Sequence, residues 1–196
     1  MASSDSGHQS PPNSVSPIPV DLFVSKKHPG LSRGELGFAD SSGNILFRAS
    51  SVASSPKTRS SRRNKKRIVL DASGNPIFSI YPQENGSWQA FKWADGGDKD
   101  LVFRVQRTLN NFTRTELEVF LVGETAEEPV ADFKVIGFPF QRSCTIYRGD
   151  SILAQTSLMY KLHQIFVGRS KFRLTIFPAS VDTRLIVALT VIFLNS

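Results

Sequence analysis

Cysteine and histidine are scarce in this sequence, which restricts its redox and metal chemistry. Among 196 residues there are one cysteine, Cys144, and three histidines, His8, His28 and His163. A single cysteine forms no intramolecular disulfide, as is typical of proteins kept in a reducing, intracellular compartment. The histidines are far apart, and none is followed by a second candidate ligand three or four positions further along the chain. We therefore expect no zinc site and no other metal.

The sequence also lacks a secretory signal and a membrane-spanning segment. No basic start followed by an apolar run is visible at the N-terminus, so we expect a protein that is not secreted. The most apolar stretch covers residues 185–194, where Thr190 has the only polar side chain. A transmembrane helix requires about 20 apolar residues, and Arg184 and Asp182 come just before this stretch. We expect an intracellular protein with no transmembrane span.

No catalytic signature stands out, and we expect no enzyme activity and no cofactor. The glycines of residues 92–100 are not followed by Lys-Ser or Lys-Thr, which excludes a phosphate-binding loop there. The aspartates Asp95, Asp98 and Asp100 surround Lys99 without a closing glutamate, which favours a solvated hairpin loop over a calcium site. A nucleophilic pair of Cys144 with His163 is an alternative to a core cysteine on a strand, but cysteine is so often buried that we favour the core position.

Short apolar segments separated by turn residues dominate the rest of the chain. The apolar content of 40% is enough for a sizeable core. Each segment alternates or is rich in β-branched and aromatic residues, and Gly, Asn, Asp or Pro separates nearly every pair, which favours antiparallel hairpins. We expect about twelve strands on this pattern. They cover residues 20–27, 34–40, 44–50, 67–71, 76–82, 88–93, 101–107, 116–122, 132–137, 144–149, 151–156 and 172–178.

Two of the turns share the form D-x-S-G-N, at residues 40–44 and 71–75. In each, a Gly-Asn pair precedes an apolar strand and supplies a positive φ at little cost. Two similar hairpin turns are the favoured interpretation. A calcium loop would need more oxygen ligands than either copy has.

The apolar stretch near the C-terminal end predicts a buried helix over about residues 183–194. Ser180 and Asp182 are both good N-cap residues. Such a helix has no polar face, so it must be surrounded by apolar side chains. A final central strand is the alternative, because valine, isoleucine, threonine and phenylalanine favour strands.

Two segments differ in composition from this pattern. Residues 1–19 are rich in serine and proline and predict a disordered leader. A second stretch predicts a flexible basic loop over about residues 50–66. Seven cations and no acid lie within residues 57–67, and without them the net charge of +7 falls to zero. These cations are Lys57, Arg59, Arg62, Arg63, Lys65, Lys66 and Arg67.

The segments resemble, in their order and turn motifs, the plant LURP-one-related proteins. The resemblance covers roughly residues 19–196 and rests on VDLFVSKK (20–27), SSGNILFR (41–48), VLDASGNPIFSI (69–80), DLVFRVQRT (100–108), ELEVFL (116–121), DFKVIG (132–137), RSCTIYRG (142–149) and FPASVDTRLIVALTVIF (177–193). The domain of that family is similar to the C-terminal domain of Tubby and to phospholipid scramblases. The resemblance implies a mainly β fold, a closed antiparallel barrel of about twelve strands around the C-terminal apolar helix.

The resemblance also implies a non-enzymatic module that binds phosphoinositide or another anionic phospholipid at a membrane surface. It implies membrane-tethered signalling or transcription-related regulation, with a role in plant defence. The basic cluster is the candidate site, although the lipid-contacting residues of the family do not match it one by one. A nuclear import signal, a weak nucleic-acid contact and a merely solubilising loop remain alternatives. A scramblase-like lipid transporter is a less favoured interpretation.

These interpretations predict where the protein is found and with what it associates. We expect a monomer in the cytoplasm, at the inner face of the plasma membrane or in the nucleus. The expected partners are a phosphoinositide-containing membrane surface or an import receptor.

Overall fold

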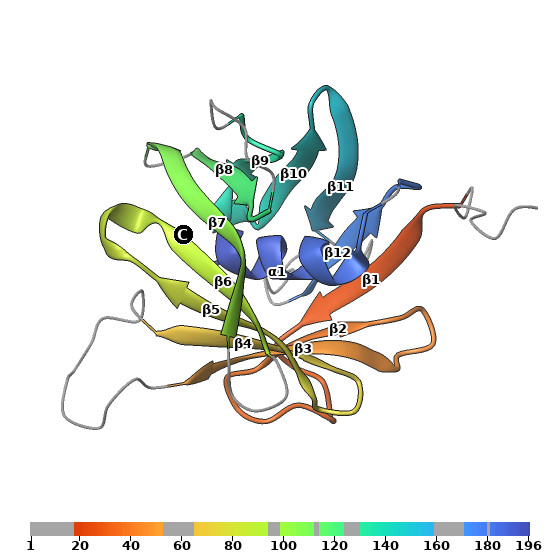
Figure 1. Cartoon of the computed structure of the whole chain (residues 1–196). Coiled ribbons are helices and arrows are strands. Elements are labelled where there is room, and N and C mark those ends of the chain that lie inside the picture. The colour runs from red at the N-terminus through yellow and green to blue at the C-terminus, as the bar shows by residue number, and fades with distance from the viewer. Residues whose placement is uncertain are drawn as a thin grey trace, which may run out of the picture.

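A computed structural model describes residues 18–52, 65–93, 99–111, 114–123, 130–158, 171–179 and 181–196. In these residues the chain forms twelve strands and one α-helix, α1 (Thr183–Phe193), with two short 3-10 helices, η2 (Glu84–Gly86) and η3 (Pro139–Gln141) (Figure 1). All twelve predicted strands are confirmed with small shifts at their ends. The strands are β1 (Val20–Ser25), β2 (Leu36–Ala39), β3 (Ile45–Val52), β4 (Lys66–Asp71), β5 (Pro76–Pro82), β6 (Trp88–Trp93), β7 (Lys99–Asn110), β8 (Thr115–Leu121), β9 (Phe133–Phe138), β10 (Ser143–Arg148), β11 (Ser151–Leu158) and β12 (Lys171–Ile176).

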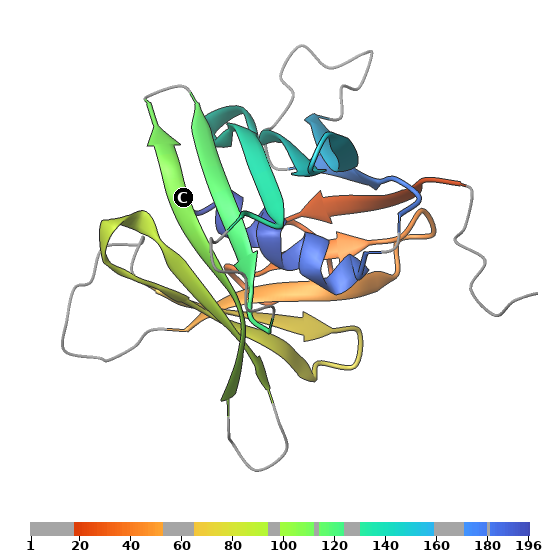
Figure 2. The ribbon, with the colours of Figure 1, turned by 45° about the horizontal axis from the view of Figure 1, so that its top comes forward.

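The strands form a closed antiparallel barrel in which each strand pairs with the next along the chain (Figure 2). Closure comes from β1, which pairs with β2 on one side and with β12 on the other. Leu22 of β1 lies opposite Leu174 of β12, and both side chains are buried. Closure leaves no free sheet edge to recruit another chain. The predicted fold class is therefore confirmed.

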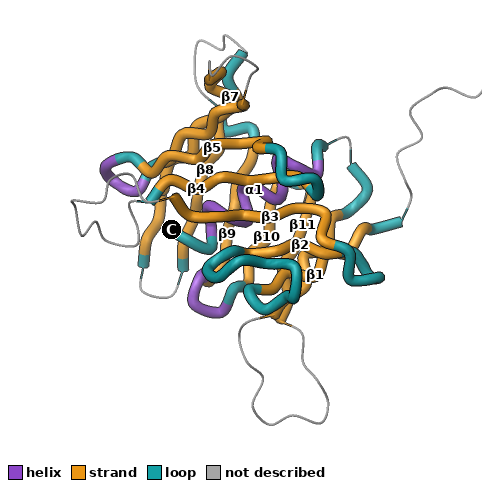
Figure 3. The backbone as a smooth tube through the Cα atoms, turned by 90° about the horizontal axis from the view of Figure 1, so that it is seen from below, coloured by secondary structure: helices purple, strands orange, loops and turns teal. Residues whose placement is uncertain are grey.

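The helix α1 lies inside the ring of strands (Figures 1 and 3). Asp182 is its N-cap and accepts a hydrogen bond from the Arg184 backbone nitrogen at 2.9 Å. Every residue from Leu185 to Phe193 is buried. The hydroxyl of Thr190 donates to the Ile186 carbonyl oxygen at 2.8 Å, which satisfies the one polar side chain of this stretch. Apolar strand residues surround the helix, as a helix without a polar face requires. No helix among the described residues combines the length and apolarity required to cross a bilayer.

The two D-x-S-G-N segments form the same turn, as predicted. Asn44 donates from its backbone nitrogen to Asp40 at 2.8 Å and from its amide to the other carboxylate oxygen at 3.1 Å, and Asn75 makes the same two bonds to Asp71. The glycines have φ angles of 86° and 89°. These hydrogen bonds from asparagine lower the pKa of both aspartates, because they stabilise the ionised carboxylate.

The predicted loop over residues 50–66 is too long at both ends. Strand β3 continues to Val52 and β4 begins at Lys66, and these two residues are paired in register. Ser50 and Ser51 also pair in this ladder, opposite Ile68 and Arg67, so β3 and β4 stay paired beyond the ends of the predicted strands. Residues 53–64 lie outside the described part, as do residues 1–17 of the predicted leader. Neither 3-10 helix was expected from the sequence.

Candidate functional site

Three of the seven predicted site residues lie in the described part of the chain. Lys65 immediately precedes β4, and Lys66 and Arg67 are its first two residues. The other four lie outside the described residues. They are Lys57, Arg59, Arg62 and Arg63. The structure therefore places only the end of the basic segment, where it enters the barrel.

Lys66 lies on the outer face of the barrel among aromatic side chains. Its ammonium nitrogen is 4.9 Å from the ring centroid of Tyr81 and 5.3 Å from that of Trp93. The ring of Phe91 packs edge-on against Tyr81, with centroids 5.5 Å apart. Ile80, next to Tyr81, is fully buried, so Tyr81 faces outward. We call Lys66, Tyr81, Phe91 and Trp93 the outer cluster. Its distances fall within the range of cation–π attraction.

Arg67, one position further along β4, points to the inner side of the barrel. Adjacent strand residues face opposite sides, and Arg67 pairs with the buried Ile80 of β5. Its side chain is half-buried, and this desolvation lowers the pKa of its guanidinium. The Nε atom is buried and has no hydrogen-bond partner among the described residues. Lys66 and Arg67, although neighbours in the basic segment, thus lie on opposite faces of the barrel wall.

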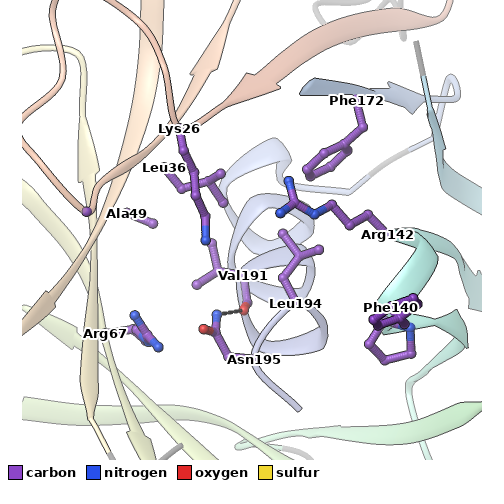
Figure 4. A pocket seen from close by; sticks show the side chains of 12 residues that line it. Lys26, Leu36, Ala49, Arg67, Phe140, Arg142, Phe172, Val191, Leu194 and Asn195 are labelled. Atoms are coloured by element: carbon purple, nitrogen blue, oxygen red, sulfur yellow. Dashed lines mark hydrogen bonds between the residues drawn. The ribbon is translucent and has the colours of Figure 1, made fainter. Parts of the chain in front are cut away.

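Arg67 lines a cavity of about 320 Å³ beside the C-terminal end of α1 (Figure 4). Two more cations line it: Lys26, which follows β1, and Arg142, which precedes β10. Figure 4 shows the Lys26 and Arg142 side chains reaching toward the cavity from different sides, with Val191 and Leu194 of the helix end between them. None of the described residues that line the cavity is acidic. We call it the mouth cavity, defined by Lys26, Arg67 and Arg142.

The 3-10 helix η3 forms one lip of the mouth cavity. Phe140, in this helix, lines the cavity and is still 74% exposed, and Phe138 just before the helix is 39% exposed. Arg142 follows η3 with a φ of 55°, in the left-handed conformation, and its backbone nitrogen donates to the Pro139 carbonyl at 3.1 Å. This conformation is uncommon outside glycine. It ends the short helix and leads the chain into β10.

Thr156 of β11 holds the backbone on both sides of Ser143. Its buried hydroxyl accepts from the Cys144 backbone nitrogen at 2.7 Å and donates to the Arg142 carbonyl oxygen at 2.9 Å. A hydroxyl has one proton, and the Arg142 carbonyl is its nearest acceptor. Thr156 therefore fixes the segment that carries Arg142 into the mouth cavity.

Cys144 is buried in the core, and the ring of His28 is held by hydrogen bonds to the backbone. Cys144 is 2% exposed, and burial raises the pKa of its thiol to about 12. The interpretation as a buried strand cysteine is confirmed, and His163, its suggested partner, lies outside the described residues. His28 accepts from the Gly30 nitrogen at Nδ1 over 3.2 Å, so its Nε2 donates to the Gly43 carbonyl oxygen at 3.0 Å. The described residues contain no group of three or more metal-ligating side chains of the His, Cys, Asp and Glu types.

Comparison with known proteins identifies the family. The family model described as LURP-one-related matches residues 20–194. The chain belongs to the LURP-one-related family. It is 52% identical to Protein LURP-one-related 7 of Arabidopsis thaliana over the whole of both chains, and 31% identical to Protein LURP-one-related 15 of the same plant, over 92% of this chain and 82% of that one. The family resemblance inferred from the sequence motifs is confirmed.

A solved structure of a similar protein supports the barrel independently. An X-ray structure of an Arabidopsis thaliana protein superposes with a TM-score of 0.60 at 29% identity, covering 92% of each chain. The names of the two relatives state a family and no ligand.

Sequence reasoning found one of the three cations of the mouth cavity. Arg67 belonged to the predicted basic cluster, whereas Lys26 and Arg142 were part of strand motifs with no assigned role. They lie 41 and 75 positions from Arg67, as their numbers show, and only barrel closure brings them together. A cation at or just before the end of a predicted strand, at the same end of the barrel as the basic cluster, is the signal that could have found them.

Proposed function

We propose that this LURP-one-related chain is a non-enzymatic, Tubby-like module that binds anionic phospholipid, phosphoinositide in particular. In this proposal it acts at the inner face of the plasma membrane in signalling or transcription-related regulation, with a role in plant defence. Family membership supports the general class of module. The outer cluster supports the choice of a membrane surface.

The outer cluster has the composition of a membrane-interface contact. Tryptophan and tyrosine favour the headgroup region because each has an apolar ring and a polar tip, and lysine adds a charge on a flexible apolar stem. Here Trp93 is 41% exposed, and the Lys66 ammonium lies over both rings. Such a surface gains apolar contact and attraction to anionic lipid at the same point.

The sequence places further cations directly before the outer cluster. Near an anionic leaflet each lysine or arginine contributes about 1 kcal/mol. Residues 57–65 carry five cations and no acid immediately before Lys66. The outer cluster would give this charge a fixed point of attachment on the barrel.

Liposome flotation of the purified full chain tests the proposal. Vesicles of phosphatidylcholine, with and without phosphoinositide, are compared for the wild type, Lys66→Gln, Trp93→Ala and the double variant. Lys134→Gln is the charge-matched control, since Lys134 lies on β9 and its ammonium contacts Glu118 at 3.5 Å, away from the outer cluster. A variant with Arg62, Arg63, Lys65, Lys66 and Arg67 all changed to alanine removes the end of the basic segment.

The proposal expects phosphoinositide-dependent flotation that weakens in the double variant and survives in Lys134→Gln. Absence of flotation by the wild type on phosphoinositide vesicles contradicts it. If, in addition, the five-alanine variant fails to accumulate in nuclei where the wild type does, import by a receptor becomes the function of the basic segment.

A further inference from the structure

The strands β3, β4, β5 and β6 carry apolar side chains on the outside of the barrel. These strands are neighbours in the sheet (Figure 3). Val69 of β4 is fully buried, so strand alternation turns Ile68 and Leu70 outward, and the burial of Ala49 on β3 turns Val52 outward in the same way. With the three rings of the outer cluster they form the β3–β6 face, which consists of Val52, Ile68, Leu70, Tyr81, Phe91 and Trp93. None of the six belongs to the described core of the barrel.

The position of Ser79 shows how closely these side chains cover the sheet. Ser79 lies on β5 between the inward residues Phe78 and Ile80, opposite Ile68 on one side and Phe91 on the other. It therefore faces outward, but it is 0% exposed, and its hydroxyl has no hydrogen-bond partner among the described residues. A hydroxyl buried without a partner is unfavourable. The outer side chains thus exclude water from this part of the sheet.

Elsewhere the outside of the barrel carries ion pairs. Glu118 of β8 contacts Lys134 of β9 at 3.5 Å, and Asp21 of β1 contacts Arg173 of β12 at 3.5 Å. Buried residues adjoin each of these four along its strand, so all four face outward. Charged and apolar outward residues are therefore separated around the barrel. A contiguous apolar patch on an outer surface is typical of an interaction site.

The charges at the β3–β6 face favour an anionic partner. Lys66 lies on this face, and Arg48 faces outward opposite Leu70, with its Nε atom buried and without a hydrogen-bond partner among the described residues. Asp71 is the only acid in the four strands, and it alternates with Leu70 to face the other side. The sequence adds five cations and no acid in residues 57–65, directly before Lys66.

The shape of the barrel favours a bilayer over a protein as this partner. Closure leaves no strand edge with which another chain could pair. A partner helix is bound in a groove, whereas this face lies on the convex outside of the barrel. A second copy of the chain would bring the cations of two such faces together, and like charges repel.

We propose that the β3–β6 face enters the headgroup region of an anionic bilayer, so that the barrel lies on its side on the membrane. This inference rests on the proposed function and names the part of the barrel that contacts lipid. Ile68 and Leu70 leave water for the boundary of the acyl chains, and Trp93 takes the position that aromatic residues favour at this depth. Arg48 and Lys66 reach the lipid phosphates from their apolar stems.

The two tryptophans of the chain report on the two sides of the barrel wall. Trp93 is 41% exposed on the β3–β6 face, and Trp88 is 3% exposed and faces the inside. The full chain is bound to vesicles of phosphoinositide and phosphatidylcholine, with acyl chains that are brominated or unmodified. Bromine quenches tryptophan emission only at short range. Trp93→Phe keeps a ring on the face and leaves Trp88 as the reporter, and both proteins are compared at lipid concentrations that bind them fully.

A matched pair of isoleucines tests whether the face itself binds. Ile68 on this face and Ile136 on β9 are both half-buried and face outward, since Val135 and Gly137 beside Ile136 are buried. Flotation on phosphoinositide vesicles compares the wild type with Ile68→Ser and Ile136→Ser. Ile68→Ser should bind roughly tenfold more weakly, because one apolar side chain no longer leaves water on binding. Ile136→Ser should bind like the wild type.

We expect brominated lipid to quench the wild type and to leave Trp93→Phe unchanged. Flotation of the wild type without quenching, equal quenching of both proteins, or equal weakening by the two serine variants overturns this inference alone. Absence of flotation by the wild type overturns the proposed function together with it. Size-exclusion chromatography over a range of concentrations tests the remaining occupant: a wild-type dimer that Ile68→Ser disrupts, without quenching on vesicles, would assign the face to a second copy and overturn the inference.

Discussion

The hydroxyl of Thr156 donates to the Arg142 carbonyl oxygen at 2.9 Å, so a buried strand residue sets the position of a cation in the mouth cavity. The same hydroxyl accepts from the Cys144 nitrogen at 2.7 Å. The two bonds join β11 to the start of β10 at the point where the chain leaves η3. Barrel stability and cavity geometry are therefore coupled at this residue.

Replacing Thr156 by valine should lower the stability of the barrel. The Cys144 backbone nitrogen loses its buried acceptor, and we expect the free energy of unfolding to fall by about 1–3 kcal/mol. The Arg142 carbonyl oxygen loses its donor in the same variant, which adds to this loss. Thr156→Ser keeps the hydroxyl and should retain most of the stability. Denaturant unfolding of both variants checks this, and an equal loss of stability in the valine and serine variants would refute the structural role of the hydroxyl.

Gly137→Ala should be among the most damaging small substitutions. A Cβ atom there would overlap the Ser143 carbonyl oxygen and lie 2.6 Å from the Cys144 Cα atom, and neither backbone atom can move without disturbing the β9–β10 pairing. We expect the free energy of unfolding to fall by about 1–3 kcal/mol or more. Gly37→Ala is the control, since the atoms it meets, at 2.9 Å, belong to the flexible Leu31 side chain. Thermal unfolding should rank Gly137→Ala as the less stable variant.

The turn aspartates should make stability depend on pH in the acid range. The pKa of Asp71 is lowered from 3.8 by hydrogen bonds from Asn75. A carboxylate with a lower pKa in the folded state stabilises the fold above its unfolded pKa, and this contribution is lost as the pH falls through the folded value. Asp71→Ala should therefore lower the melting temperature at neutral pH, with a difference from the wild type that shrinks below about pH 3. A constant difference across that range would contradict the assignment.

Cys144 should resist modification in the folded protein. Its thiol is 2% exposed, and with a pKa of about 12 it carries almost no thiolate at neutral pH. A colorimetric thiol reagent should react slowly with native protein and rapidly after unfolding in denaturant. Fast reaction under native conditions would show that the β9–β10–β11 region opens readily.

Most of the fold could be predicted from the sequence because its contacts follow chain order. Every strand pairs with the next, so hairpin signals such as the turns after Asp40 and Asp71 reveal neighbours directly. The burial of the helix could also be predicted, because a helix without a polar face must be surrounded by apolar side chains. The exceptions are strand ends such as Val52 and Lys66, which tertiary pairing extends. Periodicity alone does not set such boundaries.

The candidate site was less predictable, because it depends on faces and on closure. The charge density of the sequence placed Lys66 and Arg67 in one cluster. In the strand, however, they face opposite sides: Lys66 lies in the aromatic outer cluster and Arg67 lines the mouth cavity. The partners of Arg67 come from the end of β1 and from the segment before β10. Nothing in their local sequence indicates a shared cavity, which exists only in the closed barrel.

Flotation on phosphoinositide vesicles at low and at physiological salt tests the membrane proposal most directly. The account predicts that the wild type floats only when phosphoinositide is present, that salt weakens this binding, and that Lys66→Gln with Trp93→Ala weakens it further while Lys134→Gln does not. Equal recovery with neutral vesicles, or none with phosphoinositide at low salt, would contradict it.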